Sequence, residues 1–197
     1  MNLRGIIIAV LIACAAVARE AEAPTPTNQF KVFSRPEWIP ERGPIPGQVI
    51  RAEGRSYFFL PPRGWNATAN PIERSVTFLP EDQSASIRVR ILELAGQSLE
   101  TLDSDVTKTN LLLLHPSGVL VRSFKCHTSA RPGVAFDVER QLSNLPPITI
   151  RTAFVPFDQD LVEFTLTAET KRLGQFRWFL GNLMSSFRQE NAVAAER

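Results

Sequence analysis

The chain has few of the side chains on which catalysis and metal binding depend. Its 197 residues include two cysteines and two histidines. The spacings Cys-x-x-Cys and His-x-x-x-His, a glycine-rich phosphate loop and the acidic loop of a calcium-binding EF-hand are all absent from the sequence. We therefore expect no enzyme activity, no catalytic residues and no bound cofactor.

The two cysteines, Cys14 and Cys126, are too few for a disulfide scaffold. Cys126 precedes His127, but neighbouring side chains on a strand point to opposite faces, so these two cannot form a catalytic dyad. We expect Cys126 to be a buried, unreactive core residue. Its face of the strand is expected to hold Leu120 and Phe124 and to meet Val134, Phe136 and Val138. The opposite, solvated face is expected to hold Lys125, His127, Asp137 and Glu139.

A charge excess of one sign is also missing, because 22 lysines and arginines stand against 20 acidic residues. A net charge of +2 gives no reason to expect a nucleic acid or an anionic membrane as partner. Six basic residues do fall on expected strands: Arg88, Arg90, Arg122, Lys125, Arg140 and Arg151. They form either one sheet face that receives an acidic partner or solvated positions beside acidic residues, and the near-neutral charge favours the second interpretation.

The N-terminal segment predicts export. Met1–Arg4 carries one positive charge, Gly5–Val17 is an uninterrupted apolar run, and Ala16-Val17-Ala18 places small residues before a cleavage site. Residues 1–18 are interpreted as a signal peptide, since a membrane span needs about 20 apolar residues. The mature chain is then extracytoplasmic, and the lack of disulfides favours the bacterial periplasm over a eukaryotic extracellular space.

Cys14 has two interpretations. Leu11-Ile12-Ala13-Cys14 resembles the bacterial lipobox, in which the cysteine is acylated and becomes the mature N-terminus. Alternatively, Cys14 only fills the apolar core of an ordinary signal peptide, as the short distance from Arg4 indicates. The protein is then either lipid-anchored through Cys14, its sole contact with a membrane, or soluble in the periplasm.

Proline dominates the next segment. Residues 24–50 hold six of the fifteen prolines and show neither helical nor strand periodicity. Proline removes backbone donors and favours an extended chain, so we expect residues 19–55 to form a linker or arm. Apolar side chains indicate that part of it docks on the folded domain or on a partner. These are Phe30, Phe33, Trp38 and Ile39.

Residues 56–188 are predicted to form an α+β domain, followed by a disordered tail at 189–197. Runs with period-two alternation, such as Ala85–Leu94, predict strands, and the short turns between them predict hairpins. The expected strands are 57–60, 76–79, 85–94, 119–128, 134–142, 148–157 and 161–168. We expect an antiparallel sheet of six to seven strands flanked by helices, as an α/β/α sandwich.

Two segments have helical periodicity. Ser98 is a suitable N-cap for a helix that runs to about Leu114. Its buried residues are expected to be Leu99, Leu102, Val106, Leu112 and Leu113. The segment of about Glu169–Arg188 has an apolar stripe at steps of three and four residues. This stripe consists of Leu173, Phe176, Leu180, Leu183 and Phe187.

Two polar groups are weak site candidates. Asp158 and Asp160 flank a hairpin tip, where acidic residues are ordinary turn formers, and two carboxylates fall short of the roughly six to eight oxygens that calcium prefers. Asn66-Ala67-Thr68 fits the N-glycosylation triplet, which carries little meaning in a bacterial envelope protein.

The order and spacing of several segments are similar to those of the PsbP-like superfamily. The segments are Pro61-Pro62-Arg63-Gly64-Trp65, 76–78, 86–94, the helix from Ser98, 161–167 and Ser185-Ser186-Phe187. The superfamily includes the extrinsic P protein of photosystem II, a Ran-binding import factor and DcrB-like bacterial envelope lipoproteins. The resemblance implies an antiparallel sheet between helices in a non-enzymatic accessory or binding module, and it assigns no site residue.

Two functions remain open at this point. The first is an exported, non-enzymatic binding or assembly module of the bacterial cell envelope, with an envelope protein as its partner. The alternative is a periplasmic carrier of a small ligand or metal ion, with a pocket between sheet and helices near Tyr57, Trp65 and Trp178. Aromatic residues in such places more often belong to the core.

Overall fold

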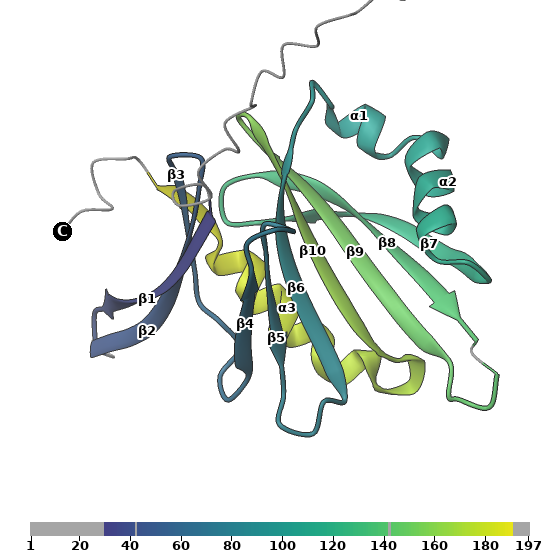
Figure 1. The fold of residues 1–197 in the computed structure, drawn as a ribbon, viewed down its shortest axis with the longest axis horizontal. Helices are drawn as coiled ribbons and strands as arrows, with labels where there is room; N and C mark the ends of the chain where they lie inside the picture. Colours follow the sequence, from purple (N-terminus) through teal and green to yellow (C-terminus); the bar gives the residue numbers. More distant parts are fainter. Residues whose placement is uncertain (1–29, 42, 142, 191–197) are drawn as a thin grey trace, which may run out of the picture.

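A computed structural model describes residues 30–41, 43–141 and 143–190. The larger of its two sheets is antiparallel and has seven strands (Figure 1). In spatial order these are β4 (Asn66–Asn70), β5 (Ser75–Leu79), β6 (Ala85–Glu93), β10 (Asp160–Glu169), β9 (Ile148–Phe157), β8 (Pro132–Arg140) and β7 (Gly118–His127). The expected α+β class is confirmed, and β4 is a strand that the sequence pattern did not indicate.

Helices cover both faces of this sheet. On one face α3 (Leu173–Ser186) packs its buried Leu180 and Leu183 into the main core, which includes Val155 of β9. On the other face α1 (Leu99–Leu102) and α2 (Asp105–Leu114) pack against Phe154. Because consecutive residues of a strand point to opposite faces, Phe154 and Val155 place the two helical layers on opposite sides. The expected sandwich is confirmed.

A second, four-stranded antiparallel sheet lies beside the first (Figure 1). Its order is β1 (Phe30–Ile39), β2 (Gly43–Ala52), β3 (Arg55–Phe59) and β11 (Arg188–Glu190). The expectation of a linker over residues 19–55 is therefore wrong for the part that the structure describes, and the expected tail begins inside a strand. Residues 19–29 and 191–197 lie outside the described residues.

The register explains why these prolines do not prevent a hairpin. Pro36 lies opposite Pro46, and Trp38 lies opposite Pro44, so the prolines occupy alternate rungs of the β1–β2 ladder. In an antiparallel pair, alternate rungs make no hydrogen bonds between the two strands. β3 pairs with β2 only from Gln48 to Ala52. Pro44 and Pro46 therefore do not need to donate a hydrogen bond to β3. Proline is tolerated at such edge positions.

An aromatic cluster joins the two sheets. Phe187, the residue after α3, is fully buried and stacks on Tyr57 and Phe59 of β3, with ring centroids 5.6 and 5.7 Å away. It also meets Phe157 and Phe164 of the larger sheet edge-on, at 5.7 and 5.0 Å. Phe187 was expected at the end of the helical stripe, and it serves here as the contact between the sheets.

The segment expected as one helix from Ser98 forms two. Ser98 accepts a hydrogen bond from Thr101 N–H in a capping box, as expected, but α1 ends after one turn and Ser104 caps α2 afresh. The second cap changes the helical phase, so Leu111 is buried, whereas Val106 and Leu113 are 69% and 74% exposed. The expected burial of Val106 and Leu113 is wrong for this reason.

Within the residues that the structure describes, no helix is long and apolar enough to cross a membrane. The predicted signal peptide at 1–18 and the candidate lipidation site Cys14 lie outside those residues.

Candidate functional site

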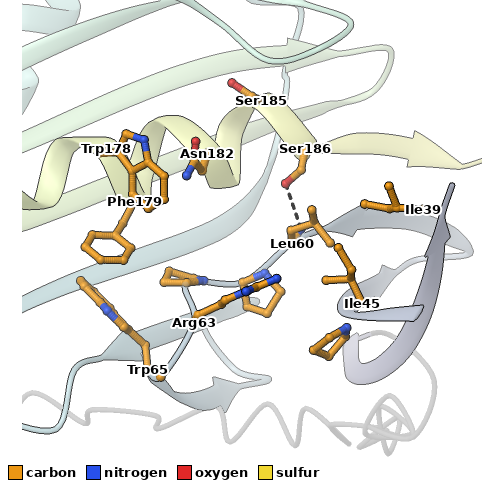
Figure 2. A pocket seen from close by; sticks show the side chains of 14 residues that line it. Ile39, Ile45, Leu60, Arg63, Trp65, Trp178, Phe179, Asn182, Ser185 and Ser186 are labelled. Carbon is orange, nitrogen blue, oxygen red and sulfur yellow. Dashed lines mark hydrogen bonds between the residues drawn. The ribbon is translucent and has the colours of Figure 1, made fainter. Parts of the chain in front are cut away.

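A groove of about 990 Å³ lies between three segments of the chain. The tip of the β1–β2 hairpin contributes Ile39, Ile45 and Pro46, and the connection from β3 to β4 contributes residues 60–65. The C-terminal half of α3 contributes the rest, from Trp178 to Ser186. Figure 2 shows the rings of Trp65 and Phe179 at one end, Ile39 and Ile45 at the other, and Arg63 between them.

Local sequence explains the wall formed by residues 60–65. Pro61 and Pro62 end β3, because proline cannot continue a ladder. Gly64 then takes a left-handed backbone with φ of 74°, and Trp65 N–H donates to Pro62 O at 3.3 Å to close a turn. This turn aims the Trp65 ring at α3, where its centroid lies 5.3 Å from that of Phe179.

The wall is also tied directly to the helix. Leu60 N–H donates to Ser186 Oγ at 2.9 Å (Figure 2). Ser186 Oγ donates in turn to Leu183 O at 2.9 Å. Both hydrogen-bonding functions of this hydroxyl are therefore used inside the protein. This wall of the groove is therefore held in place by the protein itself and does not need a bound ligand to form.

The aromatic pocket expected from the sequence is partly correct. Trp65 and Trp178 line the groove, and Trp178 keeps 64% of its surface exposed although its ring lies against Phe179. Tyr57 is fully buried and points into the core, where its hydroxyl donates to Asp160. Ile39 and Ile45 were missed, because the hairpin that carries them was expected to be a linker.

Among the free polar side chains of the groove, N–H and O–H donors outnumber the acceptor oxygens. Its lining includes Arg63, Asn182 and Ser185 but no aspartate or glutamate. None of these three side chains makes a hydrogen bond or ion pair within the described part of the chain. An arginine, a carboxamide and a hydroxyl are thus available to a bound molecule, beside an apolar surface.

A second, smaller cavity of about 230 Å³ lies between α3 and the strands β7, β8 and β9. Cys126 lines it together with Phe124, Arg151 and Met184. The expected partners of Cys126 are wrong, because a bulge between Leu120 and Arg122 shifts the register of β7. Phe124 and Cys126 therefore face α3 opposite Ala135 and Gly133, while Val134 and Phe136 face α1 and α2.

Cys126 is half-buried at the edge of the core rather than fully buried as expected, and we expect its thiol to react slowly in the native protein. Burial raises its pKa to about 11, against an ordinary value of 9.0. Two pKa units reduce the thiolate fraction near pH 8 by about 100-fold, and the thiolate is the reactive form. Iodoacetamide labelling of a Cys14→Ala chain should accordingly be slower by about that factor in buffer than in guanidinium chloride. Equal rates in the two conditions would contradict a buried thiol.

Asp137 corrects another expectation, since it was placed on the solvated face. It is buried, and Arg151 donates to both of its oxygens, from Nε at 2.7 Å and from Nη2 at 2.8 Å. Arg122 Nε adds a third hydrogen bond at 2.8 Å. Burial alone would raise the pKa of Asp137, but the hydrogen bonds and charges of the two arginines outweigh it and lower the pKa.

The expected arginines do not share one face. Arg122 and Arg151 point toward the α3 side, whereas Arg88 and Arg90 bind Glu163 on the α2 side, at 3.1 and 2.5 Å. Glu163 adjoins Phe164 of the main core and so points to the opposite face. These four arginines lie on two opposite faces of the sheet and are paired with buried acidic residues. They therefore do not form the single basic face that could receive an acidic partner.

The two aspartates considered as weak calcium ligands are paired with other side chains of the chain. Asp160 is buried and accepts hydrogen bonds from Tyr57 and from Arg55, whose Nη2 lies 2.8 Å from Oδ1. Asp158 is paired with Arg131 instead. Residues 30–41, 43–141 and 143–190 contain no group of three or more histidine, cysteine or acidic side chains that could hold a metal ion. Asn66-Ala67-Thr68 lies on β4, an exposed edge strand.

No protein-family model and no curated protein matches this chain. It is similar to cyanobacterial PsbP (CyanoP) from Synechocystis sp. PCC 6803, with a TM-score of 0.56 and 15% identity over 91% of this chain and 99% of that one. Similarity is lower to the Saccharomyces cerevisiae Ran-binding protein Mog1p, with a TM-score of 0.47 and 13% identity over 67% and 89% of the two chains. For Mycobacterium tuberculosis LpqN, involved in cell envelope biogenesis, the TM-score is 0.43 at 8% identity over 81% and 92%. The similarity to cyanobacterial PsbP shows that the chain has the PsbP-like fold that its motifs indicated.

Proposed function

We propose that the chain is an exported, non-enzymatic binding module of the bacterial cell envelope, and that it binds a protein partner in the groove. The observation that carries this proposal is the exposed Trp178 in a preformed apolar groove. Exposed tryptophan costs free energy in water and is enriched where partners bind. Export is inferred from residues 1–18, which also leave the choice between a soluble and a lipid-anchored form.

The alternative of a small-ligand or metal carrier has less support. The cavity between the sheet and α3 holds about 230 Å³, below the roughly 300–1,000 Å³ of ordinary ligand pockets. The described residues contain no cluster suited to a metal ion. The groove is large enough, but its exposed tryptophan and open walls suit a chain that continues beyond it.

The photoreactive aromatic residue p-benzoylphenylalanine, in place of Trp178, tests the proposal in intact cells and keeps an aromatic side chain at the position that anchors the partner. Trp38 supplies a matched control position, because it is 73% exposed on β1 but does not line the groove. We expect crosslinking to one defined protein from position 178 and none from position 38, with the adduct in the extracytoplasmic fraction. Crosslinks of equal yield from both positions, or none from 178, would contradict a groove-bound partner.

A further inference from the structure

We infer that the groove takes an extended, proline-rich peptide segment of neutral or negative charge. This inference rests on the proposed function and names the class of partner that the groove fits. It is carried by three features of the lining: its hydrogen-bonding groups, its charge and the distribution of its apolar side chains.

The hydrogen-bonding groups of the groove match a ligand that lacks donors. Arg63 and Asn182 present N–H groups, and they make no hydrogen bond within the described residues. A proline-rich segment has few N–H groups of its own, while all its carbonyl oxygens stay free because the polyproline helix has no internal hydrogen bonds. An ordinary extended peptide would instead bring one N–H per residue, and the free side chains of the lining offer only Asn182 Oδ1 and Ser185 Oγ to receive them.

The charge of the lining disfavours a basic ligand. Arg63 is the one charged side chain among the residues that line the groove. Two ion pairs between β1 and β11 neutralise their own charges, because Arg35 binds Glu190 and Arg188 binds Glu37. A lysine or arginine in the ligand would meet Arg63 without compensation, whereas an acidic residue would gain a partner.

The apolar side chains suit a ligand with rings at intervals. Trp65, Trp178 and Phe179 lie at one end, and Ile39 and Ile45 lie at the other (Figure 2). Aromatic-lined grooves are the usual receptors of proline-rich segments, whose rigid conformation lowers the entropy cost of binding. Trp178 and Ser186 are eight residues apart on α3, about 12 Å at the helical rise. About four residues of a polyproline helix cover that length.

Strand addition at the same place is less compatible with the chain. The edge strands of the four-stranded sheet are β1 and β11; Pro36 interrupts the donors of β1, and β11 has only three residues. A lipid acyl chain would bury the aromatic rings but would leave the N–H groups of Arg63 and Asn182 unpaired.

Panning a random dodecapeptide library against the full chain tests the inference. We expect the recovered peptides to contain more proline than the starting library and less lysine and arginine. Trp178→Ala should weaken binding of the recovered peptides by about tenfold or more, as expected for a tryptophan that anchors an interface. Trp38→Ala, the exposed tryptophan outside the groove, should leave the affinity unchanged. Arg63→Gln should remove the preference for acidic over basic peptides.

The outcomes separate this inference from the proposed function. Recovered peptides without a proline excess, or with an excess of lysine, overturn the inference; if their binding still depends on Trp178, the groove remains a protein-binding site. Trp178-dependent sedimentation with phosphatidylglycerol vesicles, without peptide binding, overturns the inference in favour of a lipid. Absence of crosslinks from position 178 in cells bears on the proposed function alone.

Discussion

Replacing Phe187 with alanine is expected to lower the free energy of unfolding by about 3–5 kcal/mol. The ring is fully buried and contacts four other aromatic rings, two from each sheet. The neighbouring strands are held by backbone ladders and cannot collapse into the space that the ring leaves, so a cavity adds to the loss of buried apolar surface. Urea unfolding followed by tryptophan fluorescence measures the change.

The same variant should loosen one sheet more than the other. Phe187 holds β3 against the larger sheet, so hydrogen exchange should accelerate first in β1, β2 and β3. Leu113→Ala is a suitable control, because Leu113 is 74% exposed and surface substitutions change stability by about 0.5 kcal/mol or less. A loss below about 1 kcal/mol for Phe187→Ala, or uniform exchange across both sheets, would show that the sheets are joined in another way.

Replacing Asp137 with alanine should also cost about 3–5 kcal/mol, because it leaves a buried arginine without its partner. Arg151 is 90% shielded from solvent, and Asp137 accepts two hydrogen bonds from its guanidinium. Arg151 also lies over the Phe124 ring, 4.9 Å from its centroid, which keeps it in this apolar setting. Urea unfolding at pH 7 measures the loss.

A second variant distinguishes the pairing from packing. Asp137→Val combined with Arg151→Met replaces the buried pair by apolar side chains and should recover most of the stability, since such replacements are often neutral. The pKa of Asp137 is lowered in the folded state, so its contribution is present above its ordinary pKa near 4 and declines as the pH falls through the folded value. The deficit of Asp137→Ala should therefore shrink in acid. A deficit that is independent of pH would mean that the charge of Asp137 does not matter.

The strands of the larger sheet illustrate what local pattern predicts well. Ala85–Leu94 alternates with period two, and β6 spans Ala85–Glu93 with Ile87, Val89 and Ile91 all buried on one face. The apolar stripe of α3 was predicted equally well, since Phe176, Leu180 and Leu183 are buried as their spacing indicated. Both patterns show which face of one element meets the core, and the sequence of that single segment is enough to predict it.

The candidate site was less accessible to sequence reasoning. Trp65 and Trp178 were predicted to line a pocket, and they do line the groove. Ile39 and Ile45 line it as well, but they lie in a segment whose composition is typical of a proline-rich linker. The prolines are acceptable there only because Pro36 and Pro46 share one rung of the β1–β2 ladder and Pro44 lies two rungs further on. That arrangement is a property of two paired strands, and neither strand shows it alone.

The sequence by itself determined the α+β class, the position of most elements of the larger sheet, and the scarcity of catalytic and metal-binding side chains, because each of these follows from composition or from the period of one segment. Only the tertiary structure decided that residues 30–52 form a hairpin, that Cys126 faces α3, and that Asp137 is buried with Arg151. These features depend on register between strands, where a single bulge at Leu120–Arg122 exchanges the two faces. The groove has the same origin, since it exists only where the hairpin, the Leu60–Trp65 turn and α3 converge.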